Sequence, residues 1–303
     1  MAETEDEFLE SYDASKYDKP SASVDILVFS IGKGKRETYR QLPKSHLQIL
    51  LIRRKNHPFQ NCWALPGGFL NMDETLREAA ARELYEETGL KPDYLGQLYS
   101  WSDVNRDPRT RIISTSYMAL VNENNKQLCA GDDAGEAKWF TLGSKIEQVD
   151  SRKLEGGTEY IWNIRLTLKN GQDELSALIR ITRCFIGSTV SIKRELVENN
   201  GLAFDHAKMI EHGLEKFRHK IKYTDLLFKL VPEFFTLTEL QHVYEAVMDK
   251  KVSRASFRRN IADKVLETEQ YVKKGGHRPS QLYVFNPYWL EASLLEGVVD
   301  LWS

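Results

Sequence analysis

The sequence predicts an α+β fold that is divided into two domains. The chain has 303 residues, which is enough for two ordinary domains. Its first half alternates β-like apolar runs with one long helical stretch, whereas its last third is helical and ends in a strand, a Gly-rich tip and a second strand. A hydrophobic content of 41% and a charged content of 28% are typical of a globular protein.

The composition argues against several classes of protein. A net charge of −2 creates no global attraction to nucleic acid or membranes, so any nucleic-acid site must be a local patch. The apolar run at 47–52 is too short to span a bilayer, and the N-terminus lacks the basic and apolar regions of a secretory signal. We therefore expect no membrane partner and a cytoplasmic location. Cys62, Cys129 and Cys184 lie far apart, which indicates reduced thiols rather than a disulfide or zinc framework.

The first domain is predicted over residues 23–222, after a polar N-terminal arm at 1–22. A helix is expected over 74–88. Strands are expected where apolar and β-branched residues cluster, at 24–30, 47–55, 112–121 and 136–142.

A β-rich segment interrupts this domain at about 145–200. Its centre holds Asn170-Gly171 between two apolar runs, 159–168 and 173–185. Both residues accept a positive φ, so the pair predicts a two-residue hairpin turn. We interpret the segment as an inserted or appended hairpin.

The second domain is predicted over residues 223–303, after a helix at 204–221. Thr236 and Glu239 have the spacing of a capping box, in which each side chain satisfies a free backbone N–H of the other. The helices expected in this domain cover 223–232, 236–249 and 253–266.

Carboxylates crowd the helix expected over 74–88. Glu83 and Glu87 are four residues apart and lie one above the other, in the sector that also holds apolar residues, with Glu86 at its edge. Like charges at this spacing cost about 0.2–0.5 kcal/mol, and partial burial adds several kcal/mol per ion. A solvated surface helix is one interpretation. The other is a bound divalent cation, which would offset both costs, and oxygen ligands favour Mg²⁺ or Mn²⁺.

The spacing around these carboxylates favours the metal site. It runs Gly68, five residues, Glu74, seven residues, Arg82-Glu83-Leu84, one residue, Glu86-Glu87, one residue, Gly89-Leu90. This frame resembles the Nudix box at every defined position, and the preceding "WALPGG" is also similar to Nudix hydrolases. The resemblance implies a mixed sheet sandwiched between helices. It also implies hydrolysis of a nucleoside diphosphate linked to another group, with Mg²⁺ or Mn²⁺ as cofactor.

The resemblance also implies roles for the box residues. Glu83 and Glu87 would be the main metal ligands, and Glu86 would be a further ligand or would orient a metal-bound water. The carbonyl of Gly68 or its neighbour would complete the coordination. Arg82 would pair with box carboxylates, with Glu74 as one partner.

The general base differs between Nudix families. It would be either Glu83 or an acid on a later loop, where the sequence offers Asp132, Asp133 and Glu136. Of the later acids we favour Glu136, and its alternative interpretation is an ordinary surface carboxylate.

Arginines near the box are candidates for binding the diphosphate, because a guanidinium binds phosphate bidentately. We favour Arg54 and Arg109. The same two segments also hold Arg53, Arg106 and Arg111, and each arginine taken alone could be a solvated surface residue.

The last part of the chain carries a local basic patch. Residues 250–278 hold nine Lys or Arg against three Asp or Glu. On a helix through 254–266, an apolar stripe of Phe257, Ile261 and Val265 faces inward, and three arginines face outward. The predicted DNA-binding residues are these arginines and the basic residues of the hairpin tip: Arg254, Arg258, Arg259, Lys273, Lys274 and Arg278, with His277 beside them.

A helix, a turn, a basic helix and a basic hairpin are the pattern of a winged helix-turn-helix, whose second helix would enter a major groove. A solvated basic face is the alternative. Together with "FDHAKMI" and "GHRPSQLYVF", this part is similar to the Nudix-related transcriptional regulators. In that family a Nudix domain senses ADP-ribose or a related ligand and a winged helix binds double-stranded operator DNA as a dimer.

The resemblance leaves two functions open. The first is a metal-dependent hydrolase of ADP-ribose or a similar compound, and the second is a homodimeric DNA-binding repressor that senses such a compound. Many members of the regulator family have decayed boxes, whereas this box is intact. The segment 145–200 is also longer than the usual connection in that family.

Overall fold

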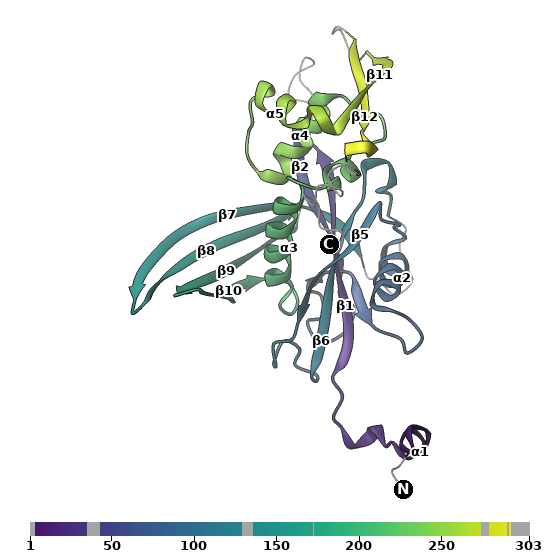
Figure 1. Ribbon diagram of the computed structural model, residues 1–303, viewed down its shortest axis with the longest axis vertical. Coiled ribbons are helices and arrows are strands. Elements are labelled where there is room, and N and C mark those ends of the chain that lie inside the picture. Colours follow the sequence, from purple (N-terminus) through teal and green to yellow (C-terminus); the bar gives the residue numbers. More distant parts are fainter. Residues whose placement is uncertain are drawn as a thin grey trace.

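The computed structural model describes residues 4–34, 43–128, 136–171, 173–273, 279–289 and 291. Its main sheet is mixed and has the strand order β10-β9-β8-β7-β2-β1-β6-β5, with the short strands β3 and β4 paired to β2 and β1 (Figure 1). Only the central pair β1 and β6 is parallel. In chain order the elements are α1 Glu5–Ser11, η1 Ala14–Lys16, β1 Ser21–Lys33, β2 Ser45–Arg53, β3 Trp63–Ala64, β4 Gly67–Phe69, α2 Leu76–Thr88, β5 Tyr94–Trp101, β6 Ile112–Leu120, η2 Glu123–Asn125, β7 Ala137–Leu154, β8 Gly157–Asn170, β9 Asp173–Ile186, β10 Thr189–Asn200, α3 His206–Lys220, η3 Leu226–Leu230, α4 Leu237–Met248, α5 Arg254–Ile261, η4 Ala262–Lys264, β11 Val265–Val272 and β12 Ser280–Phe285.

The centre of the sheet is covered on both faces, as the predicted α/β/α sandwich requires. Successive side chains of a strand point to opposite faces, so both faces of the buried strand β1 are apolar. Val24, Ile26 and Val28 join the core that includes the apolar side of α2. Leu27 and Phe29 join the core that includes α3, where Phe29 stacks on Phe217 with ring centroids 5.3 Å apart. The mixed-sheet fold is therefore confirmed.

The segment 145–200 is a larger structure than the predicted hairpin. The strand predicted at 136–142 continues to Leu154, and β10 adds a fourth strand, so β7 to β10 extend the main sheet beyond its helices (Figure 1). The turn also lies one residue later than predicted. Asn170 pairs with Asp173 and so belongs to the strand, and Gly171 after it has the positive φ of 52°.

The second domain has the predicted order of helices and strands, with two corrections. The apolar segment after α3 forms the 3₁₀ helix η3 rather than an α-helix. The basic helix α5 ends at Ile261 rather than 266, because Ala262–Lys264 tightens into a 3₁₀ turn and Val265 begins β11. The capping box at Thr236 is confirmed, and the side chain of Ser253 caps α5.

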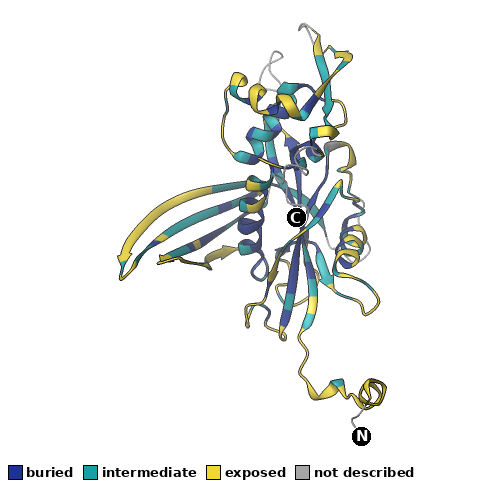
Figure 2. Ribbon diagram, viewed as in Figure 1, coloured by how far each residue is buried: buried dark blue, intermediate teal, exposed yellow. Residues whose placement is uncertain are grey.

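The described residues before β1 lie outside the core. The short helix α1 has no buried residue, and a capping box between Thr4 and Glu7 satisfies the free N–H groups of its first turn (Figure 2). In the part of the chain that the structure describes, no helix is both long and apolar enough to cross a membrane. The domain boundaries at 22/23 and 222/223 stay predictions.

Phe217 links α3 to the sheet, so its truncation tests the core. Phe217→Ala is expected to lower the free energy of unfolding by about 3–5 kcal/mol, because it leaves a cavity against Phe29. The exposed neighbour Lys216 provides the matched control, and Lys216→Ala should change stability by less than about 0.5 kcal/mol. Urea unfolding measures both, and equal effects would contradict the packing described above.

Candidate functional site

The box helix α2 has clear boundaries. Thr75 and Glu78 form a capping box at its first turn, and Gly89 ends it with a φ of 71°. The preceding loop is anchored to the sheet, because Gly67 and Gly68 pair with Asp25 and Val24 of β1. The loop and the helix therefore meet beside the middle of the sheet.

Arg82 connects the carboxylates of the box. Its guanidinium binds both oxygens of Glu74 at 2.9 and 2.6 Å, and its Nη1 donates to Glu83 Oε1 at 2.9 Å and to Glu86 Oε2 at 3.0 Å. Its Nη2 also donates to the carbonyl oxygen of Phe69 at 3.2 Å. These bonds restrict the rotamers of three carboxylates, which agrees with the pairing that the resemblance implies. Arg82 is half-buried, and its side chain lies on the side of the helix that carries these carboxylates.

Glu83 occupies space that only a glycine at position 68 leaves free. A Cβ at Gly68 would lie 2.2 Å from Glu83 Oε1, which is far inside van der Waals contact. The Glu83 side chain is only 15% exposed, and burial raises the pKa of its carboxyl above the usual value. The carboxylate of Glu83 thus lies against the backbone of Gly68.

Glu87 lies deeper in the same group. Its Oε2 accepts a hydrogen bond from the backbone N–H of Gly67 at 2.9 Å. Burial raises the pKa of its carboxyl to about 8, and the nearby charges of Glu83 and Asp25 add to this rise. A cation would relieve this crowding, and an oxygen-only donor set suits Mg²⁺ or Mn²⁺.

The carboxylates of Glu83, Glu86 and Glu87 do not converge on one point, as the ligands of a bound cation would. Among the described residues, no three acidic, His or Cys side chains converge as a metal-binding group. Arg82 holds Glu83 and Glu86 on one side, and the N–H of Gly67 holds Glu87 on the other. Metal binding therefore requires rotamer changes in at least one of these side chains.

Asp25 and His206 extend the site and were missed from the sequence. His206 Nε2 lies 3.3 Å from Asp25 Oδ1, and its Nδ1 accepts a hydrogen bond from the N–H of Leu65 at 2.9 Å. The bond from Leu65 leaves the other nitrogen, Nε2, as the donor to Asp25. The available signal was an aspartate in the apolar run "SVDILVFS", because a buried strand carboxylate needs partners.

The two arginines predicted to bind substrate lie together around one aromatic ring. The guanidinium carbons of Arg54 and Arg109 lie 4.9 and 5.8 Å from the centroid of Phe204. Phe59 packs against Phe204 at 4.7 Å, and Arg109 also lies 5.4 Å from the Phe69 ring. Burial lowers the pKa of Arg54, and the nearby charge of Arg109 adds to this. The sequence did not indicate these aromatic side chains.

All the arginines of the two segments have protein partners. Arg109 binds both oxygens of Asp107 at 3.0 and 2.8 Å, and Arg54 Nε donates to the carbonyl oxygen of Pro58 at 2.8 Å. Arg106 is buried and binds both oxygens of Asp205, at 3.3 and 2.9 Å. Arg111 donates to backbone carbonyls in the loop after β5. Arg53 lies 3.7 Å from Glu136.

Glu136, the favoured later acid, lies just before β7. Its Oε1 binds Lys138 Nζ at 2.5 Å, and its Oε2 faces Arg53. Among the described residues it forms no hydrogen bond or ion pair with a box carboxylate. Asp132 and Asp133 lie outside the described residues.

The predicted DNA-binding side chains are exposed where the structure describes them. Arg254, Arg258 and Arg259 lie on the outer side of α5, whereas Phe257 and Ile261 are buried. Lys273 follows β11 and is exposed. Lys274, His277 and Arg278 lie outside the described residues.

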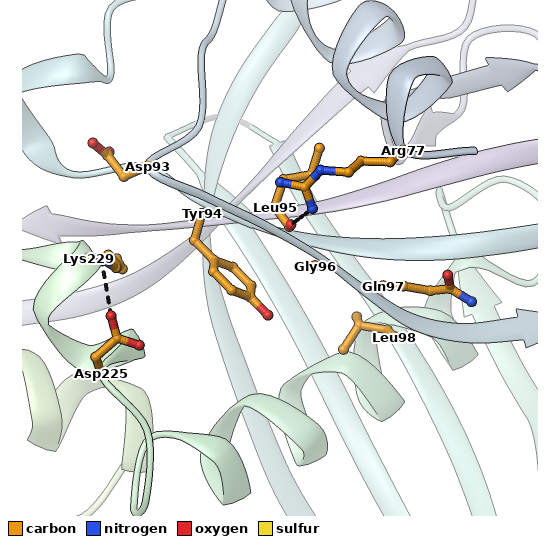
Figure 3. A pocket seen from close by; sticks show the side chains of 9 residues that line it. All are labelled: Arg77, Asp93, Tyr94, Leu95, Gly96, Gln97, Leu98, Asp225 and Lys229. Atoms are coloured by element: carbon orange, nitrogen blue, oxygen red, sulfur yellow. Dashed lines mark hydrogen bonds and ion pairs between the residues drawn. The ribbon is translucent and has the colours of Figure 1, made fainter. Parts of the chain in front are cut away.

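A hollow in the structure lies away from the predicted metal-binding, substrate-binding and DNA-binding residues. It has a volume of about 820 Å³ and lies between β5 and η3, where Arg77 donates to the Leu95 carbonyl at 2.6 Å and Lys229 pairs with Asp225 (Figure 3). It contains none of the box carboxylates. Size alone therefore does not identify the candidate site, which is defined by the carboxylates and arginines described above.

Comparisons with known proteins agree with both halves of this architecture. Residues 42–153 match the model of the NUDIX domain, and residues 227–285 match that of the NrtR DNA-binding winged helix domain. The ADPR responsive transcriptional repressor NtrR of Acinetobacter baylyi is 30% identical over 93% of this chain and 88% of its own length. The chain belongs to the family of Nudix-related transcriptional regulators.

Two further relatives extend this assignment. The crystal structure of Shewanella oneidensis NrtR complexed with a 27mer DNA superposes with a TM-score of 0.58 at 26% identity, covering 89% of this chain and 95% of the other. An ADP-ribose pyrophosphatase of Methanocaldococcus jannaschii is 47% identical over 32% of this chain and 56% of its own length. This Nudix-related regulator thus resembles a repressor along its whole length and an enzyme in its Nudix domain.

Arg82 is expected to set the affinity of the box for metal. Arg82→Lys removes the bidentate bond to Glu74 and should weaken Mn²⁺ binding by about 10–100-fold, because unsupported carboxylates lose their orientation. Arg77→Lys on the same helix is the matched control and should leave the affinity unchanged. Electron paramagnetic resonance of free Mn²⁺ measures both constants. Equal affinities for Arg82→Lys and wild type would show that the box does not depend on this arginine.

Proposed function

We propose that the Nudix domain of this regulator hydrolyses the diphosphate of ADP-ribose or a similar nucleoside diphosphate in the presence of Mg²⁺ or Mn²⁺. The observation that carries this proposal is the complete box, in which Arg82 holds Glu74, Glu83 and Glu86 and Gly68 leaves room for Glu83. The Methanocaldococcus jannaschii relative named as an ADP-ribose pyrophosphatase supports the substrate class.

Glu83, Glu86, Glu87 and the carbonyl of Gly68 would hold the metal. A bound divalent ion supplies charge neutralisation at the diphosphate and lowers the pKa of an attacking water. Arg82 would position the box carboxylates, and at least one ligand would change its rotamer as the metal binds. Burial raises the pKa of Glu87, the nearby charges of Glu83 and Asp25 add to this rise, and both effects support a cation in this position.

Arg54 and Arg109 would bind the diphosphate from the opposite side. A guanidinium matches two phosphate oxygens at once, and the aromatic ring of Phe204 keeps both arginines at one edge of the site. Phe59 and Phe204 offer ring faces on which a nucleobase can stack. This combination fits a ligand that joins a base to a diphosphate.

The general base is either Glu83 or Glu136. Glu83 lies in the box, and burial raises the pKa of its carboxyl above the usual value, which makes it a stronger base. Glu136 would have to leave Lys138 and Arg53 before it could accept a proton from water. The contacts therefore support Glu83, and mutagenesis separates the two.

Glu83→Gln is expected to abolish Mg²⁺-dependent release of AMP from ADP-ribose. Glu136→Gln should lower kcat by about 10²–10⁴-fold with unchanged Mn²⁺ affinity if Glu136 is the base, and should have little effect if it is not. Glu78→Gln is the matched control, because a glutamine at this position preserves the capping box of α2. If the wild type releases no nucleotide from a panel of nucleoside diphosphates with Mg²⁺ or Mn²⁺, the hydrolase proposal is wrong.

The second function that we propose is ligand-responsive binding of operator DNA by a homodimer. Two relatives support it: the Acinetobacter baylyi protein named as a repressor and the Shewanella oneidensis protein crystallised with DNA. The three exposed arginines of α5 provide a basic face for phosphates and base edges. The two functions are compatible, because slow hydrolysis of an effector would reset the regulator.

Helix α3 would connect ligand binding to the winged helix. At its first residue, His206 binds the loop before the box through Leu65. Near its end, Arg218 Nε donates to the carbonyl of Val247 in α4 at 2.8 Å. The helix has 15 residues, so it spans about 22 Å between the two sites. A shift of the box loop on ligand binding would therefore reach α4 and the adjoining α5.

The DNA proposal predicts a defined salt dependence. Arg258→Ala should weaken operator binding and reduce the slope of log K against log salt by about 0.9 if this arginine neutralises one phosphate. Arg180→Ala, an exposed arginine on β9 outside the winged helix, is the control and should leave the slope unchanged. Fluorescence anisotropy at several salt concentrations measures the slope, and a flat dependence for the wild type would rule out phosphate-based binding.

A further inference from the structure

A second hollow lies where the end of α3 meets α4 and α5. Its volume of about 340 Å³ is within the range of pockets that bind small molecules. Phe257 and Ile261 of α5 line it, together with Ile221 after α3 and Leu227 of η3. All four side chains are buried, so the inner lining of the hollow is apolar.

Three uncharged polar side chains also line the hollow. Ser256 and Asn260 are four residues apart on α5, so they lie on one side of that helix. Tyr244 of α4 packs against Phe257 with ring centroids 5.7 Å apart. Among the described residues, none of these three polar side chains forms a hydrogen bond, because the bond from Ser256 to the cap of α5 uses its backbone N–H. Their hydroxyl and amide groups are therefore available to a ligand.

The charge of the lining is positive. Two lysines, Lys222 and Lys264, line the hollow, and no acidic residue does so in the described chain. Lys264 Nζ donates to the carbonyl oxygen of Lys222 at 3.2 Å and lies 4.2 Å from the centroid of the Trp289 ring. The carboxylate of Asp263 acts on Lys264 from beyond ion-pair distance. An ammonium has three donors, so Lys264 keeps two that no described residue accepts.

This lining suits a small anion that carries an apolar group. Burial lowers the pKa of Lys264, because it disfavours the charged ammonium, and a bound anion would offset that cost. A carboxylate accepts hydrogen bonds from an ammonium, a hydroxyl and an amide. Inorganic phosphate has no apolar part to cover Phe257 and Ile261, and it would lose its hydration at an apolar surface. A hydrophobic carboxylate satisfies both parts of the lining.

We propose that this hollow binds a small hydrophobic carboxylate, with its acid group at Lys264 and its apolar body against Phe257 and Ile261. The site is separate from the box and from the outward arginines of α5, so the inference goes beyond the two proposed functions and does not rest on them. One wall of the hollow is α5 itself. An occupant would therefore contact the helix that carries the predicted DNA-binding arginines from its inner side.

Methyl NMR of the full chain tests the site, with benzoate as the probe. Benzoate should shift the δ1 methyl signals of Ile221 and Ile261 with a dissociation constant of about 1 mM or lower, whereas Ile49 of β2 lies away from the hollow and should keep its signal. Benzamide has the same ring without the charge, and inorganic phosphate has charge without the ring. Each should bind at least about tenfold more weakly than benzoate.

Three variants assign the binding to this hollow. Lys264→Met keeps an apolar stem but removes the charge, and it should weaken benzoate binding at least about tenfold. Ser256→Leu fills part of the hollow and should weaken the binding of benzoate and benzamide alike. Lys250→Met is the matched control, because it removes an exposed lysine that does not line the hollow, and it should bind benzoate as the wild type does. Thermal melts and unchanged methyl signals of the main sheet show that each variant is folded.

The possible outcomes separate this site from the proposed functions. The inference is overturned if benzoate causes no saturable shift at Ile221 and Ile261, or if Lys264→Met and Ser256→Leu both bind it as tightly as the wild type. Benzamide binding as tight as that of benzoate would overturn the carboxylate specificity. Operator binding is measured separately by fluorescence anisotropy. Its absence would refute the proposed DNA-binding function and leave the NMR result to decide the site, since that measurement uses no DNA.

Discussion

The structure around α2 depends on one constraint, which is the confinement of several carboxylates in a partly buried space. Arg82 provides the only guanidinium that binds more than one of the box carboxylates in the described chain, joining Glu74, Glu83 and Glu86. The carboxylate of Glu87 lies beyond its reach and has a pKa raised to about 8 by burial. A divalent cation would offset this excess of negative charge, and the loop at Gly67 and Gly68 lies against the carboxylates of Glu87 and Glu83.

The same constraint explains how the rest of the domain is arranged around the site. Strand β1 pairs with the glycine loop and carries Asp25, which His206 contacts from the first residue of α3. Helix α3 then packs on the sheet through Phe217 and reaches α4 through Arg218. Helix α3 therefore contacts both the loop before the box and the first helix of the winged helix domain. Such a link is needed in a regulator whether the ligand is only bound or also hydrolysed.

In the extension formed by β7 to β10, the residues that share a face of the sheet cannot be predicted from the sequence of each strand alone. Each strand mixes apolar and charged residues, and the charged ones suggest solvent exposure. The strand register places ion pairs such as Arg152–Glu159 on one face of the sheet. On the other face, Arg183 and Arg194 pair with Glu211 and Glu215 of α3. The exposed residues of this second face include Val149, Val190 and Ile192.

The sequence by itself determined the order of the elements and the chemistry of the box. Periodicity located the strands of the core, and the fixed spacing from Gly68 to Leu90 identified the carboxylates and Arg82, because neighbours on one helix have positions set by its pitch. Only the tertiary structure brought Asp25, His206, Phe59 and Phe204 to that helix, since these residues lie on distant segments that carry no shared period. It also decided where α5 ends and how far the β-rich segment extends. Both depend on packing and strand pairing between remote residues, which local propensity does not encode.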